Sequence, residues 1–225
     1  MLSLISALVL MLILQAEDAW AWGPVTHTAI ALDIVANPLL LAVGIASLLK
    51  ANKAAFFYGS IAPDLLALGK RELKAALHSI TAARRLTATA VTAEQKAFAL
   101  GYLGHMASDF FAHHVVIPAE TPSNGRSLVE HLAFETLVDA LMQRSVKRQF
   151  RATAVSGEIP FRHLDNGTLT AVAQRRFVLA GLVVFRALLF GTLRVNTEIA
   201  WQYDVRSFIE ASASTARLAI LRAGL

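Results

Sequence analysis

The stretch AFALGYLGHMASDFFAHHVVIP, residues 97–118, decides how the rest of the chain is interpreted. At 3.6 residues per turn, His105, Asp109 and His113 follow one another about 40° apart along one helix face, with His114 on the opposite side. The rest of the surface is mostly apolar, so the polar stripe faces the protein interior. Burying a carboxylate and two imidazoles without partners costs several kcal/mol. The pattern therefore predicts a buried helix whose stripe binds other buried groups or a cation.

Taken alone, this stripe is ambiguous. A single buried histidine is usually a hydrogen-bonded core residue, whereas three such residues at i, i+4 and i+8 fit a metal site equally well. The small residues Gly101, Ser108 and Ala112 flank the stripe. Because they are small, they would let another helix approach closely.

The composition limits the chemistry of any such site. The chain has 225 residues, enough for one domain with a substantial core, and 56 % of them are hydrophobic. It contains no cysteine, which excludes disulfides, thiolate zinc sites and a lipoprotein anchor. Any metal must therefore be held by nitrogen and oxygen. The net charge of +5 suits an anionic partner, but solubility alone accounts for it equally well.

The first residues resemble an export signal. Residues 2–14 form an apolar run that is too short to span a bilayer, and Ala19-Trp20-Ala21 matches a cleavage site. We expect residues 1–21 to be a signal peptide and Trp22 to begin the mature chain, which would be exported. No Lys or Arg precedes the run, so an uncleaved membrane anchor is the alternative. A second apolar run, residues 178–193, is interrupted by Arg186 and predicts a buried core helix.

Helical periodicity dominates the remaining sequence, and no alternating strand pattern stands out. The stretch FFYGSIAPDLL, residues 56–66, is the least helical part of the early chain, because Gly59 and Pro63 place Asp64 on a loop or at a helix start. Thr92-x-x-Gln95 predicts a capping box for the central helix. Helices are expected over residues 24–36, 39–50, 70–86, 92–118, 127–149, 169–193 and 197–222, and a loop over 157–167. These elements predict one all-α domain.

Further metal-seeking side chains occur at useful spacings. His131-x-x-x-Glu135 puts an imidazole and a carboxylate on one helix face, and Asp139 continues that stripe as a candidate partner of the ligands. His27 lies five residues after Trp22. A free α-amine has a pKa of about 7.7–8.0, so it gives up its proton to a metal at little cost. Cleavage would thus let the amine and carbonyl of Trp22 chelate a metal beside His27.

The ordered set WGPVTH, GSIAPDLL, His78, GYLGHMASDFFAHHVVIP and HLAFE resembles the bacterial zinc-dependent phospholipase C family. It is also similar to the related single-strand-specific zinc nucleases. These motifs run from Trp22 to Glu135, about half of the predicted mature chain. The resemblance implies a single compact multi-helix domain over residues 22–225 that holds up to three zinc ions.

Ligands are carried over only where the motifs match. The resemblance implies that Asp64, His78 and His105 hold one zinc ion, and that Trp22 and His27 hold a second, with Asp109 bridging the two. The third zinc ion would be held by His113, His131 and Glu135. The best-known members place the histidine after the bridging aspartate six residues later, whereas here it follows after four (His113) or five (His114). The helix-face argument favours His113, because ligation by His114 would require the helix to unwind.

The activity that the resemblance implies is phosphodiester hydrolysis by zinc-activated water, with Asp64 as both ligand and general base. The expected substrate is a phospholipid, so the protein would contact a membrane surface. Two alternatives remain open at this stage. The chain is a nuclease or another phosphodiesterase on the same scaffold, or it is a membrane-associated protein whose metal site is structural or vestigial.

Overall fold

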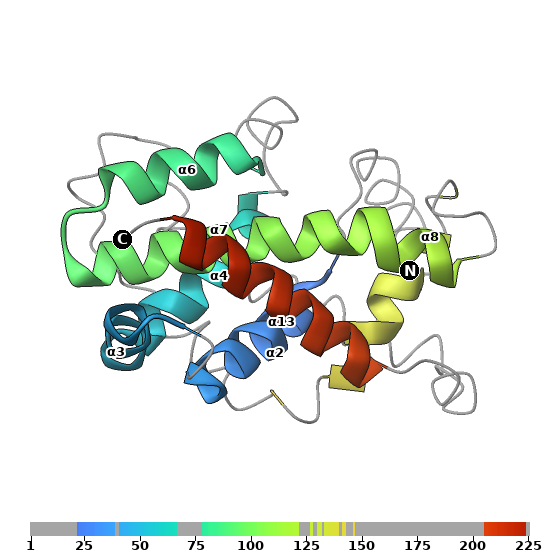
Figure 1. Cartoon of the computed structure of the whole chain (residues 1–225). Coiled ribbons are helices and arrows are strands. Elements are labelled where there is room, and N and C mark those ends of the chain that lie inside the picture. Colours follow the sequence, from blue (N-terminus) through green and yellow to red (C-terminus); the bar gives the residue numbers. More distant parts are fainter. Residues whose placement is uncertain are drawn as a thin grey trace, which may run out of the picture.

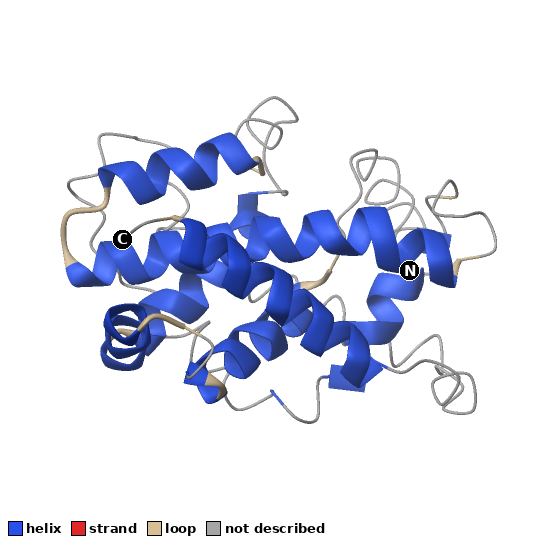
Figure 2. Ribbon diagram, in the orientation of Figure 1, coloured by secondary structure: helices blue, strands red, loops and turns tan. Residues whose placement is uncertain are grey.

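The computed structural model describes residues 22–38, 41–66, 78–121 and 205–223, together with positions 127, 130–131, 133–139, 141–142 and 146. The predicted signal peptide (1–21), the loop at 157–167 and the helix at 169–193 lie outside these residues. Within the described part the regular structure is helical and contains no strand (Figure 2). The prediction of an all-α fold is confirmed.

Among the helices in the described residues, the longest is the one that begins at Ala93, in the middle of the chain (Figure 1). Their bounds are α2 Pro24–Ala36, α3 Val43–Ala51, α4 Lys53–Leu66, α6 Ile80–Thr89, α7 Ala93–Phe111, η2 Ala112–Val116, α8 Ile117–Glu120 and α13 Val205–Arg222.

Helix α7 is the centre of the fold, and α4, α6 and α13 pack along it (Figure 1). It begins at the predicted capping box: Thr92 Oγ1 accepts the Gln95 amide at 3.1 Å, and Gln95 Oε1 accepts the Thr92 amide at 3.1 Å. Its side chains from Gln95 to Asp109 are nearly all buried, Leu100 and Tyr102 completely. A helix buried on all sides is held by packing against its neighbours rather than by its amphipathic pattern.

Helices α4 and α7 touch backbone to backbone. A Cβ added to Gly59 would overlap the carbonyl oxygen of Phe98, and a Cβ added to Gly101 would overlap that of Phe56. Only glycine permits an approach this close. The predicted close approach at Gly101 is therefore confirmed, and it brings the residues that follow Gly59 against the polar stripe of α7.

The expectation that Asp64 lies on a loop or at a helix start is wrong. Helix α4 runs through Gly59 and Pro63 to Leu66. A proline inside a helix costs about 3 kcal/mol. Phe56, Phe57 and Ile61 are at most 2 % exposed, and burying each side chain of this size stabilises by about 1.5–3 kcal/mol. Packing of α4 against α7 thus outweighs the local preference.

Helix α2 has the bounds that the sequence predicts, and α13 crosses it in space (Figure 1). Arg217 of α13 donates to both the backbone carbonyl (3.1 Å) and the carboxylate of Asp33, near the end of α2. Because Arg217 is only 5 % exposed, this is a buried tie between the two helices. None of the helices in the described residues is both long and apolar enough to cross a bilayer.

Candidate metal centre

The site is built on two buried residues of α7. His105 and Asp109 are 1 % and 2 % exposed, and their spacing of four residues puts His105 Nε2 3.2 Å from Asp109 Oδ2. Burial lowers the pKa of His105, assisted by the nearby His27, so its imidazole is neutral at pH 7. Burial alone would raise the pKa of Asp109, but His105 and His27 hold it well below its usual range. The pair therefore offers a neutral imidazole and an ionised carboxylate, the forms that bind metal.

Helix α4 orients His105 and adds a second carboxylate. The Ser60 carbonyl lies 2.9 Å from His105 Nδ1, which must donate, so Nε2 keeps its lone pair for a ligand. Asp64, one turn beyond Ser60, is fully buried with Oδ1 3.7 Å from that same Nε2. The close contact between α4 and α7 at Gly59 and Gly101 allows the Ser60 carbonyl and the Asp64 carboxylate to reach His105.

Helix α2 supplies His27 from the other side. Its Nε2 lies 3.0 Å from Asp109 Oδ1, and its ring stacks on that of His105 with centroids 3.6 Å apart. Ser108 Oγ donates to the His105 carbonyl at 2.9 Å and lies 3.4 Å from His27 Nδ1. Since its proton is already used, Ser108 can only accept from Nδ1, and this leaves Nε2 of His27 as the ligating atom.

His78 completes the cluster, although it does not sit where the sequence predicts. It lies just before α6 rather than inside a helix over 70–86, because Ser79 is the N-cap and accepts the Ala82 amide at 3.1 Å. Its Nε2 is 3.1 Å from His105 Nε2 and 3.2 Å from Asp109 Oδ2. Its side chain is 15 % exposed, so it lies at the edge of the site.

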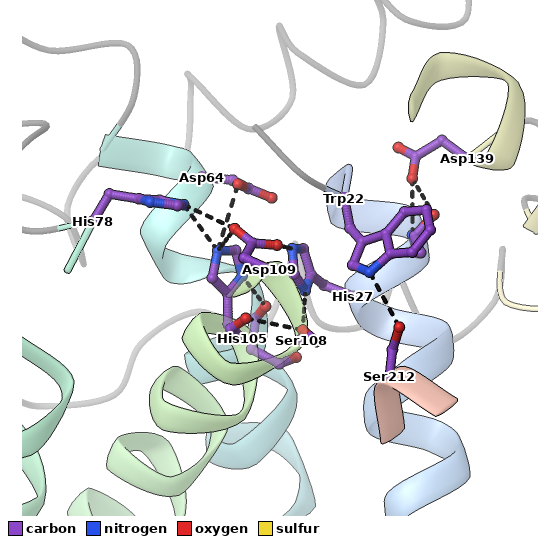
Figure 3. A network of polar contacts seen from close by, with 11 residues as sticks. Trp22, His27, Asp64, His78, His105, Ser108, Asp109, Asp139 and Ser212 are labelled. Carbon is purple, nitrogen blue, oxygen red and sulfur yellow. Dashed lines mark hydrogen bonds and ion pairs between the residues drawn. The ribbon is translucent and has the colours of Figure 1, made fainter. Parts of the chain in front are cut away.

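The donor set fits zinc. Zinc is bound tetrahedrally at about 2.0–2.1 Å by imidazole nitrogen, so its ligands lie about 3.3–3.4 Å apart. The separations among His78, His105 and Asp109 are 3.1–3.2 Å, and the Asp64 contact is 3.7 Å. Asp109 turns Oδ1 to His27 and Oδ2 to the other two imidazoles, so that each of its oxygens could contact a different ion (Figure 3).

Two triplets among the described residues bring one ligating atom from each member within 4.8 Å of one another. One is His27, Asp64 and His105, and the other is His78, His105 and Asp109. The structure thus gathers the five side chains that the resemblance assigns to the first two ions. Their roles as ligands stay predictions.

Neither triplet found among the described residues includes the side chains expected to hold the third ion. His113 and His131 have ring centroids 5.0 Å apart, and Glu135, one turn after His131, is fully buried. His114 instead stacks on the exposed Phe110 at 4.2 Å. The structure thus places His113 beside His131, and the choice of His113 as the ligand stays a prediction.

Both histidines lie in the π-helical segment η2, where the Ile117 amide bonds the Ala112 carbonyl. Pro118 has no amide to donate to the His114 carbonyl, so the regular α-helical hydrogen-bond pattern is interrupted here. Such π-helical turns are frequent at functional sites.

Trp22 is anchored by its side chain, a feature that the sequence did not reveal. The indole is fully buried and donates from Nε1 to Ser212 Oγ at 3.2 Å (Figure 3). It also packs against Phe134 and Phe208. Ser212 and Phe208 belong to α13, so the last described helix fixes the start of the predicted mature chain. No local pattern could indicate a hydrogen bond between residues 190 positions apart.

An all-α protein with a buried histidine–aspartate centre is the class that these observations define. Comparison with protein families gives a match over residues 26–177 to the family described as zinc-dependent phospholipase C. The chain belongs to this family, which supports a zinc-dependent hydrolase and confirms the resemblance drawn from the motifs. No curated protein and no solved structure matched the chain. The match begins after Trp22 and ends before α13, so the anchoring of the indole lies outside it.

Proposed function

We propose that this protein is a zinc-dependent phosphodiester hydrolase that acts on phospholipids. The observation that carries the proposal is the convergence of three imidazoles, those of His27, His78 and His105, on the Asp109 carboxylate, with Asp64 3.7 Å from His105 Nε2. Membership of the family supports zinc as the metal and hydrolysis as the reaction.

The proposed assignment has three ions. His78, His105 and Asp64 hold the first, Trp22 and His27 hold the second, and Asp109 bridges them. The third ion is assigned to His113, His131 and Glu135, supported by the 5.0 Å approach of the two rings and the buried carboxylate. When bound, the zinc ions polarise the phosphoryl oxygens and lower the pKa of water at the site.

The chain's own residues then supply position and proton transfer. Asp64 is the carboxylate placed to accept a proton from the attacking water, since it is buried beside His105, whereas three imidazoles face Asp109. The Ser60 carbonyl orients the His105 ring and the Ser108 hydroxyl orients the His27 ring, so that the Nε2 atom of each ring points into the site.

The proposed substrate is a phospholipid at a membrane surface, and the proposed location is outside the cytoplasm after cleavage behind Ala21. The apolar run at the start of the chain and the Ala19-Trp20-Ala21 site support export. An exported enzyme would meet lipid headgroups directly, and its net positive charge would favour anionic surfaces.

The test is to purify the exported protein, sequence its N-terminus, measure its zinc-to-protein ratio, and assay it on phosphatidylcholine vesicles and on single-stranded DNA. Zinc-dependent release of a phosphorylated headgroup supports the proposal. Cleavage of DNA alone would identify a nuclease and reject the lipid substrate. A protein that unfolds when zinc is removed but hydrolyses neither substrate would have a structural site.

A further inference from the structure

A buried carboxylate outside the proposed ligand set connects two parts of the centre. Asp139 is 1 % exposed and accepts two hydrogen bonds from Thr26, one from the backbone amide at 2.9 Å and one from Oγ1 at 2.6 Å (Figure 3). The two residues are 113 positions apart. The sequence indicated Asp139 as a candidate partner of the ligands, because it continues the stripe of His131 and Glu135, and these hydrogen bonds reach across to α2.

The bonds fix the beginning of α2. The N-cap residue of this helix is Gly23, which has no side chain to cap with, and Thr26 is the third residue of the first turn. The amides of a first turn have no acceptor inside the helix. Asp139 supplies that acceptor from elsewhere in the chain, and its negative charge is favoured at a helix N-terminus. The direction and position of α2 therefore depend on where Asp139 lies.

Both ends of this connection are next to proposed ligands. Thr26 immediately precedes His27, whose Nε2 is 3.0 Å from Asp109. Asp139 is one turn beyond Glu135, which is itself one turn beyond His131 in the helical residues 133–139 and 130–131. We propose that Asp139 is a positioning residue that sets the spacing between the His27 side of the centre and the His131–Glu135 side. This inference rests on the proposed function.

If Asp139 had only a structural role, its removal would have the same effect as the removal of any other buried contact that α2 makes. The tie between Asp33 and Arg217 near the other end of the same helix provides a matched control, because it too joins a carboxylate and a distant element. Removing either tie should lower the stability of the zinc-free protein. Only the tie at Thr26 lies beside a proposed ligand, so only its removal should also weaken zinc binding.

The experiment compares Asp139→Ala, Asp139→Asn and Asp33→Ala in the mature protein. Zinc affinity is measured by competition with a chelator, and the stability of the zinc-free protein by denaturant unfolding. Loss of a residue that orients metal ligands typically lowers affinity 10- to 100-fold. We expect a loss of about that size for at least one zinc ion in D139A. The zinc affinity of D139N should fall less, because its amide oxygen still accepts a hydrogen bond from the Thr26 backbone amide. D33A should have lower stability but unchanged zinc affinity.

Equal zinc affinity in D139A and wild type, or equal losses in D139A and D33A, would overturn the positioning role. If D139A fails to fold, Thr26→Val takes its place, because it removes one of the two hydrogen bonds and keeps the amide. Unchanged zinc affinity in T26V would then overturn the inference. A wild-type protein that binds no zinc would contradict the proposed function as well, which separates that failure from a failure of Asp139 alone.

Discussion

Asp109 Oδ1 lies 3.0 Å from His27 Nε2, while its other oxygen faces His78 and His105 at 3.2 Å. One carboxylate thus joins a residue of α2 to the imidazoles gathered around α7. If this carboxylate bridges two zinc ions, the binding of both ions should depend on its negative charge.

Replacing Asp109 by Asn should lower the zinc content and abolish hydrolysis together, because the neutral amide is a poor bridge between cations. The loss of activity should exceed the about 100-fold typical for residues that only orient ligands. Zinc analysis and vesicle assays check this, with Glu94→Gln at the start of the same helix as the control. Full zinc occupancy with normal turnover in D109N would contradict the assignment.

An additional residue ahead of Trp22 should remove one zinc ion. The indole would stay in its site against Ser212 and Phe208, so the extension would block only the main-chain amine. The zinc-to-protein ratio of the extended and the mature forms is the measurement. Identical ratios would show that the amine is not a ligand.

The substitution Gly101→Ala should force α4 away from α7, because the new Cβ overlaps the Phe56 carbonyl. We expect a loss of about 1–3 kcal/mol in the free energy of unfolding. Zinc binding should weaken too, since Ser60 and Asp64 move away from His105. Gly44→Ala is the control: nothing lies within 4 Å of its Cβ, so it should leave the stability unchanged or raise it by at most about 1 kcal/mol. Wild-type stability in G101A would contradict the backbone contact.

The zinc-free protein should lose stability as the pH falls below about 6.5, the usual pKa of histidine. Burial lowers the pKa of His105 in the folded state, so the unfolded chain takes up this proton first and is favoured by acid. The low pKa of Asp109 acts in the same direction at lower pH. Denaturant unfolding between pH 7.5 and 5.5 measures the slope, which should flatten in His105→Gln. An unchanged slope in that variant would place the titration elsewhere.

Local spacing was enough to predict the parts of the site that lie on one helix. The i, i+4 relation of His105 and Asp109 and the capping box at Thr92 depend only on residues one turn apart, and both are present. The α2 bounds were also predictable, because Pro24 suits a first turn and Asn37-Pro38 ends the pattern.

Tertiary contacts decided the rest. Pro63 indicated a break that the packing of α4 overrides, and His78 was assigned to the interior of a helix, whereas it lies just before Ser79, the N-cap of α6. The groups that orient the ligands, such as the Ser60 carbonyl and the Ser108 hydroxyl, carry no motif. Their role follows from the α4–α7 contact and the α2–α7 approach, which the sequence does not specify.

The anchoring of Trp22 by α13 makes the two ends of the folded chain depend on each other. A fragment trimmed to the boundaries of the family match, residues 26–177, would lack both the indole and its hydrogen-bond acceptor. Proteolytic loss of α13 alone would remove Phe208 from its contact with Phe134. It would also remove the residues that hold Trp22, two positions before the first residue of α2. A protein expressed for metal analysis should therefore retain both Trp22 and α13.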